Sequence, residues 1–121
     1  MTEKQLHKSI CIYIKTFYPK VLFNSDLSGL RMTYGQAKDV KHLRSSNGFP
    51  DLVIYEPKNN YAGLFIELKI ETPYKKNGNL KSNTHLQEQA EMLSELEKRG
   101  FKAVFGWSFD MVKDIIDNYL L

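Results

Sequence analysis

Two acidic residues and a lysine interrupt apolar runs in the middle of the chain. Asp51 opens the run 52–55, and Glu67 and Lys69 lie within the run 63–70. Charged side chains rarely enter such runs unless they are paired or bind an ion. The residue types and their spacing therefore indicate a metal site for phosphodiester chemistry.

The two runs are predicted to form a β-hairpin over 51–57 and 61–70, joined by a three-residue loop. In this register Asp51 lies directly opposite Glu67, with Cβ atoms roughly 4.5–5.5 Å apart. Two carboxylates at that distance can hold one hard divalent cation, with the backbone carbonyl of Leu68 and waters completing an octahedron. A slip of one residue would send the side chains to opposite faces.

Lys69 is expected on the same face as Glu67, about 7 Å along the strand. From there its ammonium group can orient a water or stabilise charge on a phosphate. The alternative interpretation is an ordinary surface strand that carries a Glu–Lys pair, with Asp51 as a turn residue. The Gly-Phe-Pro sequence before Asp51, the apolar flanks and the spacing favour the site.

Hydrophobic periodicity and capping residues place these runs among helices. The predicted order is α-β-β-β-α-β-α, an α/β fold in which helices cover the faces of a sheet. A capping box at Thr84 and Gln87 is predicted to start a helix that ends at about residue 99. Ser108 is predicted to cap the last helix, which ends at about residue 119. The expected helices span 3–18, 84–99 and 109–119, with a brief one compatible with 36–43; the expected strands span 21–23, 52–55, 64–70 and 102–107.

Two further polar residues lie on stripes that should face inward. Gln89 falls on the apolar stripe that includes Leu93, and Glu3 lies one turn before Leu6. Gln89 can instead be a buried amide satisfied by backbone groups. Glu3 can instead be a first-turn acid that the helix dipole favours.

Bulk properties fit one soluble domain over 1–121. The chain is 42% apolar and 26% charged, with a net charge of +3 and apolar stretches of at most four or five residues. No segment is long enough to cross a bilayer, and no hydrophobic targeting core opens the chain, which favours a cytoplasmic protein. A lone Cys11 excludes an internal disulfide. His7 and His85 show no metal-ligand spacing and are expected on helix surfaces.

Basic residues gather in two segments, 20–50 and 72–85, whereas the stretch 86–99 carries four glutamates. Basic loops beside a carboxylate site suit a polyanion that must approach acids. Solvated lysines that only aid solubility are the alternative. The candidate nucleic-acid contacts are Arg31, Lys38, Lys41, Arg44, Lys75, Lys76 and Lys81.

At these residues the chain resembles the PD-(D/E)XK nuclease superfamily and, within it, the virus-type replication-repair nuclease (VRR-NUC) domain. The sequence Gly-Phe-Pro-Asp-Leu at 48–52 is similar to the family's G-x-P-D-hydrophobic motif, and 65–69 to its E-x-K strand. Gln89, eleven residues before Gly100, is similar to the family's helical glutamine, and 101–104 to its closing strand. The resemblance covers nearly the whole chain.

The resemblance implies a restriction-endonuclease-like core with a central mixed sheet, and a Mg²⁺- or Mn²⁺-dependent nuclease. It implies that Asp51 and Glu67 bind the metal and that Lys69 lies at the attacking water. It further implies that Gln89 supports the site and that Glu3 is the acid of the first helix.

Stand-alone domains of this kind resemble viral or phage proteins that, by analogy, dimerise to cut branched DNA such as Holliday junctions. The leading hypothesis is therefore a DNA endonuclease for replication, recombination or repair, in the bacterial cytoplasm if a phage encodes it. One alternative is a non-catalytic nucleic-acid-binding accessory module that retains the fold, and another is an RNA nuclease. The long basic loop 72–83 departs from the family pattern and leaves the substrate open.

Overall fold

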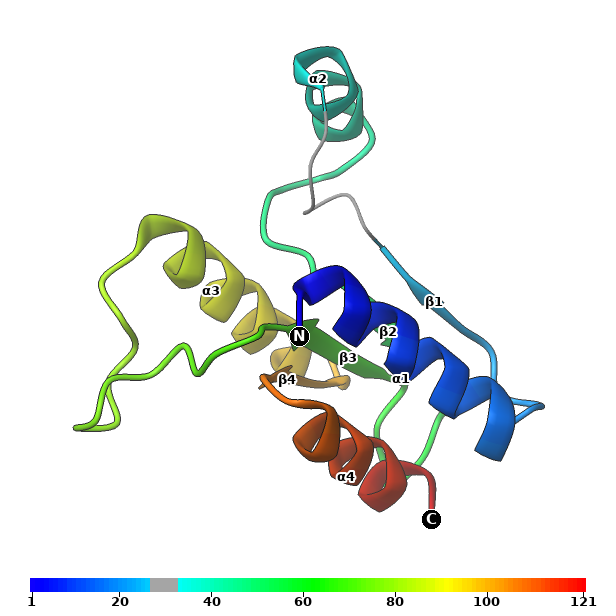
Figure 1. Ribbon diagram of the computed structural model, residues 1–121. Coiled ribbons are helices and arrows are strands. Elements are labelled where there is room, and N and C mark those ends of the chain that lie inside the picture. The colour runs from blue at the N-terminus through cyan, green and yellow to red at the C-terminus, as the bar shows by residue number, and fades with distance from the viewer. Residues whose placement is uncertain (27–32) are drawn as a thin grey trace.

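A computed structural model describes residues 1–26 and 33–121. In these residues the order is α-β-α-β-β-α-β-α, which is the predicted order with the brief helix near 36–43 present as α2 (Figure 1). No helix in this described part is long and apolar enough to cross a membrane. The elements are α1 (Glu3–Phe17), β1 (Phe23–Ser25), α2 (Tyr34–His42), β2 (Leu52–Ile54), β3 (Leu64–Leu68), α3 (Thr84–Lys98), β4 (Lys102–Gly106) and α4 (Phe109–Leu120).

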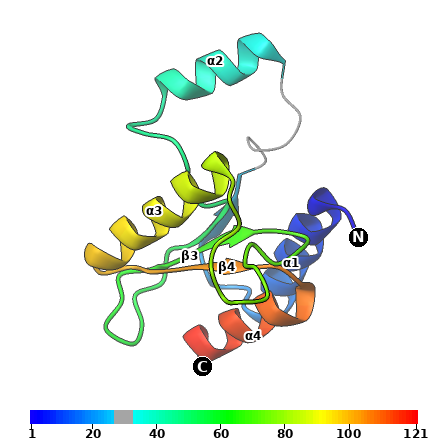
Figure 2. The same ribbon diagram turned by 90° about the vertical axis from the view of Figure 1, so that its left-hand side faces the viewer.

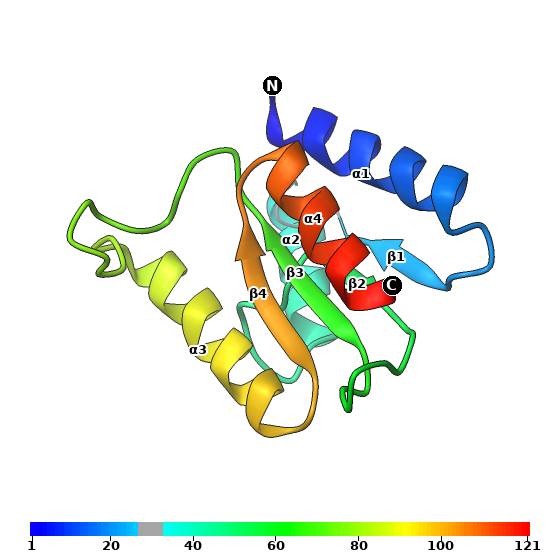
Figure 3. The same cartoon turned by 90° about the horizontal axis from the view of Figure 1, so that it is seen from below.

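The described strands form a mixed sheet, as predicted, and their order in the sheet is β1-β2-β3-β4. The pairs β1–β2 and β2–β3 are antiparallel, and β3–β4 is parallel. Helices α1 and α4 cover one face of the sheet and α3 covers the other, whereas α2 stands away from the sheet (Figures 2 and 3). The result is a three-layer α/β arrangement with one apolar cluster on each side of the sheet.

Strand alternation distributes the apolar side chains between the two clusters. Successive residues of a strand point to opposite faces, so the even-numbered residues of β3 enter one cluster and Phe65 packs against the other. The larger cluster, under α1 and α4, contains Leu6, Ile10, Ile14, Leu52, Ile54, Leu64, Ile66, Leu68, Val112, Ile116, Tyr119 and Leu120.

Side-chain caps fix where the helices begin. Thr2 forms the capping box of α1, and the Ser108 side chain accepts a 3.1 Å hydrogen bond from the backbone N–H of Met111, which is the predicted cap of α4. The predicted cap at Thr84 is wrong, because the side chain of Asn83 accepts a 3.2 Å hydrogen bond from the backbone N–H of Leu86. Asparagine is a stronger N-cap than threonine, so α3 begins at Thr84 itself.

The hairpin has the predicted register but a different turn. Leu52 pairs with Ile66, so one step further places Asp51 opposite Glu67. The predicted three-residue loop is wrong: Asn59 and Asn60 adopt φ values of 54° and 68° and form a two-residue turn. Because the loop is one residue shorter than predicted, the chain between β2 and the turn has one residue more than predicted. The register beside Asp51, at the other end of the hairpin, is unchanged.

Strand β1 begins two residues later than the predicted 21–23. Its position is set by pairing with β2, in which Ser25 lies opposite Leu52, and not by the local β propensity of Val21 and Leu22. The shift brings Ser25 and Asp26 to the same end of the sheet as Asp51. The backbone N–H of Asp26 donates to the Asp51 carbonyl oxygen at 2.6 Å.

Candidate functional site

Strand β2 begins at Leu52, directly after Asp51, whereas its partner β3 continues beyond Ile66 to Leu68. The register carried two residues beyond Leu52 pairs Pro50 with Leu68, and Pro50 has no N–H to donate, so the ladder ends there. Just before it, Gly48 adopts φ +87°, and a Cβ at this position would lie 2.8 Å from the carbonyl oxygen of Glu88. A glycine at position 48 therefore lets the chain pass close to α3, and Asp51 follows at the end of the hairpin where the ladder stops.

Asp51 and Glu67 converge at this end, as the register predicts. Both are buried, with 8% and 3% of their surface exposed. The backbone N–H of Asp51 donates to Glu67 Oε2 at 3.1 Å, and the N–H of Leu68 donates to Asp51 Oδ2 at 3.1 Å. In an extended strand the carbonyl of Leu68 points to the same side as its N–H, so it also faces Asp51.

Lys69 and Gln89 both reach the Glu67 carboxylate. Lys69 Nζ lies 3.7 Å from Glu67 Oε1, and the Gln89 side-chain amide donates to the same oxygen at 2.6 Å. Gln89 is buried on α3, and its Oε1 has no hydrogen-bond partner among residues 1–26 and 33–121. The amide therefore contacts a carboxylate and not the backbone groups of the alternative interpretation.

The first two turns of α1 bring Glu3 and His7 to Asp51. Their ligand atoms and one Asp51 carboxylate oxygen all lie within 4.8 Å of one another. The expected surface position of His7 is wrong: only 2% of the residue is exposed, and its Nε2 lies 3.8 Å from Asp51 Oδ2. The signal was present in the sequence, since His7 follows Glu3 by four residues and therefore shares its helix face.

Burial controls the protonation of the two acids. Desolvation raises the pKa of Glu67 far above its usual range, the Asp51 charge raises it further, and Lys69 opposes both effects. Desolvation also raises the pKa of Asp51, against the hydrogen bonds from Glu67 and from the Leu68 N–H. The protein alone therefore keeps a proton in this carboxyl pair at pH values where an exposed pair would lose it.

Three of the predicted nucleic-acid contacts lie on the segment after β3. Lys75 and Lys76 are exposed, and Lys81 lines a hollow of about 210 Å³ together with Lys69. This segment is folded back on itself, because the N–H of Lys81 donates to the Pro73 carbonyl at 2.9 Å. The structure thus places Lys81 in the same hollow as Lys69 of the carboxylate site.

The remaining predicted contacts lie before β2. Lys38 is exposed on α2, and Arg44 Nη2 lies 2.7 Å from Asp26 Oδ2. Arg31 lies outside the described residues, as does the side chain of Lys41.

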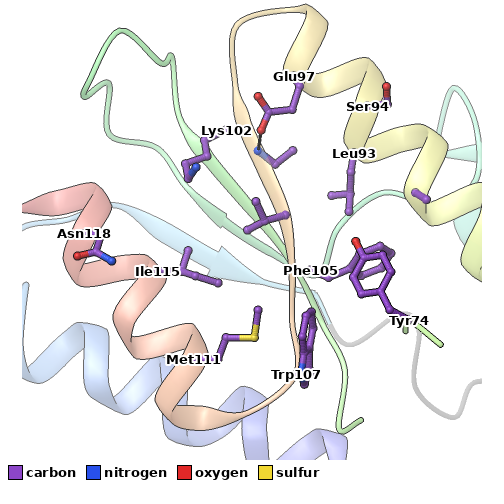
Figure 4. A pocket seen from close by; sticks show the side chains of 13 residues that line it. Tyr74, Leu93, Ser94, Glu97, Lys102, Phe105, Trp107, Met111, Ile115 and Asn118 are labelled. Carbon is purple, nitrogen blue, oxygen red and sulfur yellow. Dashed lines mark hydrogen bonds between the residues drawn. The ribbon is translucent and has the colours of Figure 1, made fainter. Parts of the chain in front are cut away.

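A larger hollow of about 620 Å³ lies between α3, β4 and α4 (Figure 4). Its lining is mostly apolar and includes Leu93, Trp107 and Met111. Glu97 lies at its rim and accepts a 2.9 Å hydrogen bond from the backbone N–H of Ala103. Without a second acid among its described lining residues, this hollow does not offer the chemistry of the carboxylate pair.

No protein-family model matches the chain, and no curated protein matches it. The chain is similar to a solved structure described as "VRR_NUC domain protein", with a TM-score of 0.68 and 23% sequence identity. The alignment covers 99% of this chain and 88% of the other chain. At this identity the likeness shows the fold. The predicted fold is therefore confirmed, and the chain shares the fold of a VRR_NUC domain protein.

Proposed function

We propose that the protein is a divalent-metal-dependent endonuclease that hydrolyses DNA phosphodiester bonds, with branched DNA as its substrate. The observation that carries this proposal is the convergence of Asp51, Glu67 and Lys69 at the open end of one hairpin. The fold shared with a VRR_NUC domain protein supports it.

The donor set fits Mg²⁺ or Mn²⁺. Carboxylate and carbonyl oxygens are the ligands that such ions prefer, and Asp51, Glu67 and the Leu68 carbonyl supply them. The pKa values of the two buried carboxyl groups stay raised although Lys69 lies beside them, and a divalent cation would provide further positive charge in place of the proton. These three residues are therefore the proposed ligands, with Glu3 at the margin of the site.

A bound divalent ion supplies Lewis acidity and a more acidic bound water. The chain's own residues supply the positioning. Lys69 would orient the attacking water and stabilise negative charge on the phosphate. Gln89 holds the Glu67 carboxylate in place through its 2.6 Å hydrogen bond, and the burial of both acids excludes bulk water from their inner side.

The basic segments provide the proposed DNA contacts. Replacing both Lys75 and Lys76 by alanine is expected to weaken DNA binding and to lower the slope of log K against log salt by about 2, because each phosphate contact contributes about 0.9. Fluorescence anisotropy over a salt series measures this slope. The control is the same double change at the exposed Lys15 and Lys98, which lie outside the basic segments, and equal slopes in all three proteins would count against this contact surface.

The deciding experiment is a cleavage assay with matched four-way junction, linear duplex and RNA substrates. We expect cleavage of the junction with Mg²⁺ or Mn²⁺ and none with EDTA. Salt-sensitive DNA binding without cleavage in any metal would identify a non-catalytic accessory module instead. Preferential cleavage of RNA would identify a ribonuclease.

Dimer formation and location are part of the proposal. Exposed apolar side chains such as Ile12, Phe17 and Ile70 favour a homodimer, and sedimentation that shows only monomer at micromolar concentration would contradict it. We place the protein in the cytoplasm, that of the bacterial host if a phage encodes it, which cell fractionation tests.

A further inference from the structure

His7 is a buried histidine with one nitrogen that makes no hydrogen bond in the described part of the chain. Its Nδ1 lies 2.7 Å from Ser25 Oγ, whereas its Nε2 is unpartnered. The residue is 2% exposed, so water does not satisfy this nitrogen from the protein surface. A buried polar atom without a partner is costly and needs an explanation.

The geometry around Nε2 excludes a hydrogen bond from His7 to Asp51. His7 Nε2 lies 3.8 Å from Asp51 Oδ2, which is too long for a hydrogen bond. The same Asp51 oxygen already accepts the Leu68 N–H at 3.1 Å. In the tautomer in which Nδ1–H donates to Ser25, the Nε2 lone pair is free to bind an ion, and this is the tautomer that metal-binding histidines adopt when their second nitrogen is hydrogen-bonded.

The surrounding atoms have the spacing of a ligand set. One ligand atom each from Glu3, His7 and Asp51 lies within 4.8 Å of the others. Ligands on one ion with bonds of about 2.1 Å lie roughly 3 Å apart when adjacent and roughly 4.2 Å apart when opposite. Shifts of a few tenths of an ångström to one ångström would close the three groups around one ion.

We propose that His7 Nε2 is a ligand of the ion that Asp51 binds, and that this nitrogen shifts the preference of the site from Mg²⁺ toward Mn²⁺. The inference rests on the metal site of the proposed function. Mg²⁺ favours an all-oxygen shell, whereas imidazole suits transition metals and the oxygen donors of the site accept both. A histidine among the ligands therefore acts as a selectivity residue.

The test is metal binding, measured separately for Mn²⁺ and Mg²⁺ by isothermal titration calorimetry. We expect His7→Gln to weaken Mn²⁺ binding by about 10-fold or more and Mg²⁺ binding by about 3-fold or less, since glutamine offers an oxygen in place of the nitrogen. His42→Gln, at an exposed position of α2, is the matched control and should change neither. Equal losses for the two metals, or no loss, would overturn the inference.

A second measurement needs no variant and can still overturn the inference if His7→Gln fails to fold. Pulsed electron paramagnetic resonance of Mn²⁺ bound to the wild-type protein, with ¹⁵N-labelled histidine, reports a nitrogen coordinated to the ion. We expect the ¹⁵N coupling, and its absence would overturn the inference.

The outcomes separate this inference from the proposed function. Cleavage that depends on Asp51, with unchanged metal preference in His7→Gln and no nitrogen coupling, would reject the histidine ligand and keep the nuclease. Histidine-dependent Mn²⁺ binding without cleavage of any nucleic acid would reject the nuclease and keep the ligand.

Discussion

Asp51→Asn and Lys69→Met are each expected to lower metal-dependent cleavage by about 100-fold or more, because each removes a preorganised charge from the proposed reaction site. Both changes nearly preserve size. An asparagine at position 51 also keeps an oxygen for the Leu68 N–H, which donates to Asp51 at 3.1 Å. Single-turnover rates on the substrate that the wild type cuts best measure the effect.

The two variants should differ in a second property. Asp51→Asn removes a ligand and is expected to weaken metal binding as well, whereas Lys69→Met leaves every proposed ligand in place, so its effect should fall mainly on the rate. Asp114→Asn and Lys98→Met change exposed residues on α4 and at the end of α3 and serve as matched controls. Wild-type rates in either site variant would contradict the assigned roles.

The hairpin shows why part of this site can be predicted from sequence. Alternation of apolar residues along β3 permits one register, because a slip of one residue would place Lys69 on the apolar face. That constraint holds even though the turn differs from the prediction. Asn59 and Asn60 form a shorter loop, and the extra residue is absorbed between Ile54 and Lys58, far from the acids.

The part of the site that α1 supplies could not be predicted in the same way. The helix periodicity places Glu3 and His7 on one face, but it does not say which end of the sheet that face meets. The answer depends on the pairing of β1 with β2, which brings Ser25 to within 2.7 Å of the His7 ring. Long-range strand pairing therefore decides which groups the shared face of Glu3 and His7 meets, and no local sequence signal identifies those groups.

The position of Gln89 could be predicted in part, since its burial follows from the sequence but its partner does not. Its apolar stripe on α3 predicts that it faces inward, and the structure confirms its burial. Its contact with Glu67 lies beside the close approach of Gly48 to α3, where a Cβ on the glycine would lie 2.8 Å from the Glu88 carbonyl oxygen. The glycine and the glutamine are far apart in sequence, and their relation appears only when the hairpin end is placed beside the helix.

The metal-free protein is expected to lose stability as the pH rises, and Glu67→Gln is expected to remove most of that loss. Burial and the neighbouring Asp51 raise the pKa of Glu67 above its ordinary value, so the folded state holds a proton that the unfolded state releases. For a group with a raised folded-state pKa, the stabilisation is complete below the unfolded pKa, about 4.3 for glutamate, and declines above it. The slope is about 1.4 kcal/mol for each pH unit over which one extra proton is held.

Urea unfolding in EDTA at pH 5, 6.5 and 8 measures this effect as a difference between proteins. The comparison with Glu67→Gln is needed because burial lowers the pKa of His7, and that group has the opposite pH dependence between its folded and unfolded pKa values. We expect the variant to gain on the order of 2–3 kcal/mol relative to wild type between pH 5 and pH 8. Glu91→Gln, at an exposed position of α3, should show a constant difference.

A divalent ion should reverse the pH dependence of the stability difference between wild type and Glu67→Gln. Metal binds the deprotonated carboxyl pair, so it stabilises wild type by mass action and does so more strongly as the pH rises. Glu67→Gln lacks one proposed ligand and should gain little from the same ion. If the wild type and the variant responded equally to metal, or if their stability difference were flat from pH 5 to 8, the buried pair would be a structural feature and not a cation site, and the case for hydrolysis would lose its physical basis.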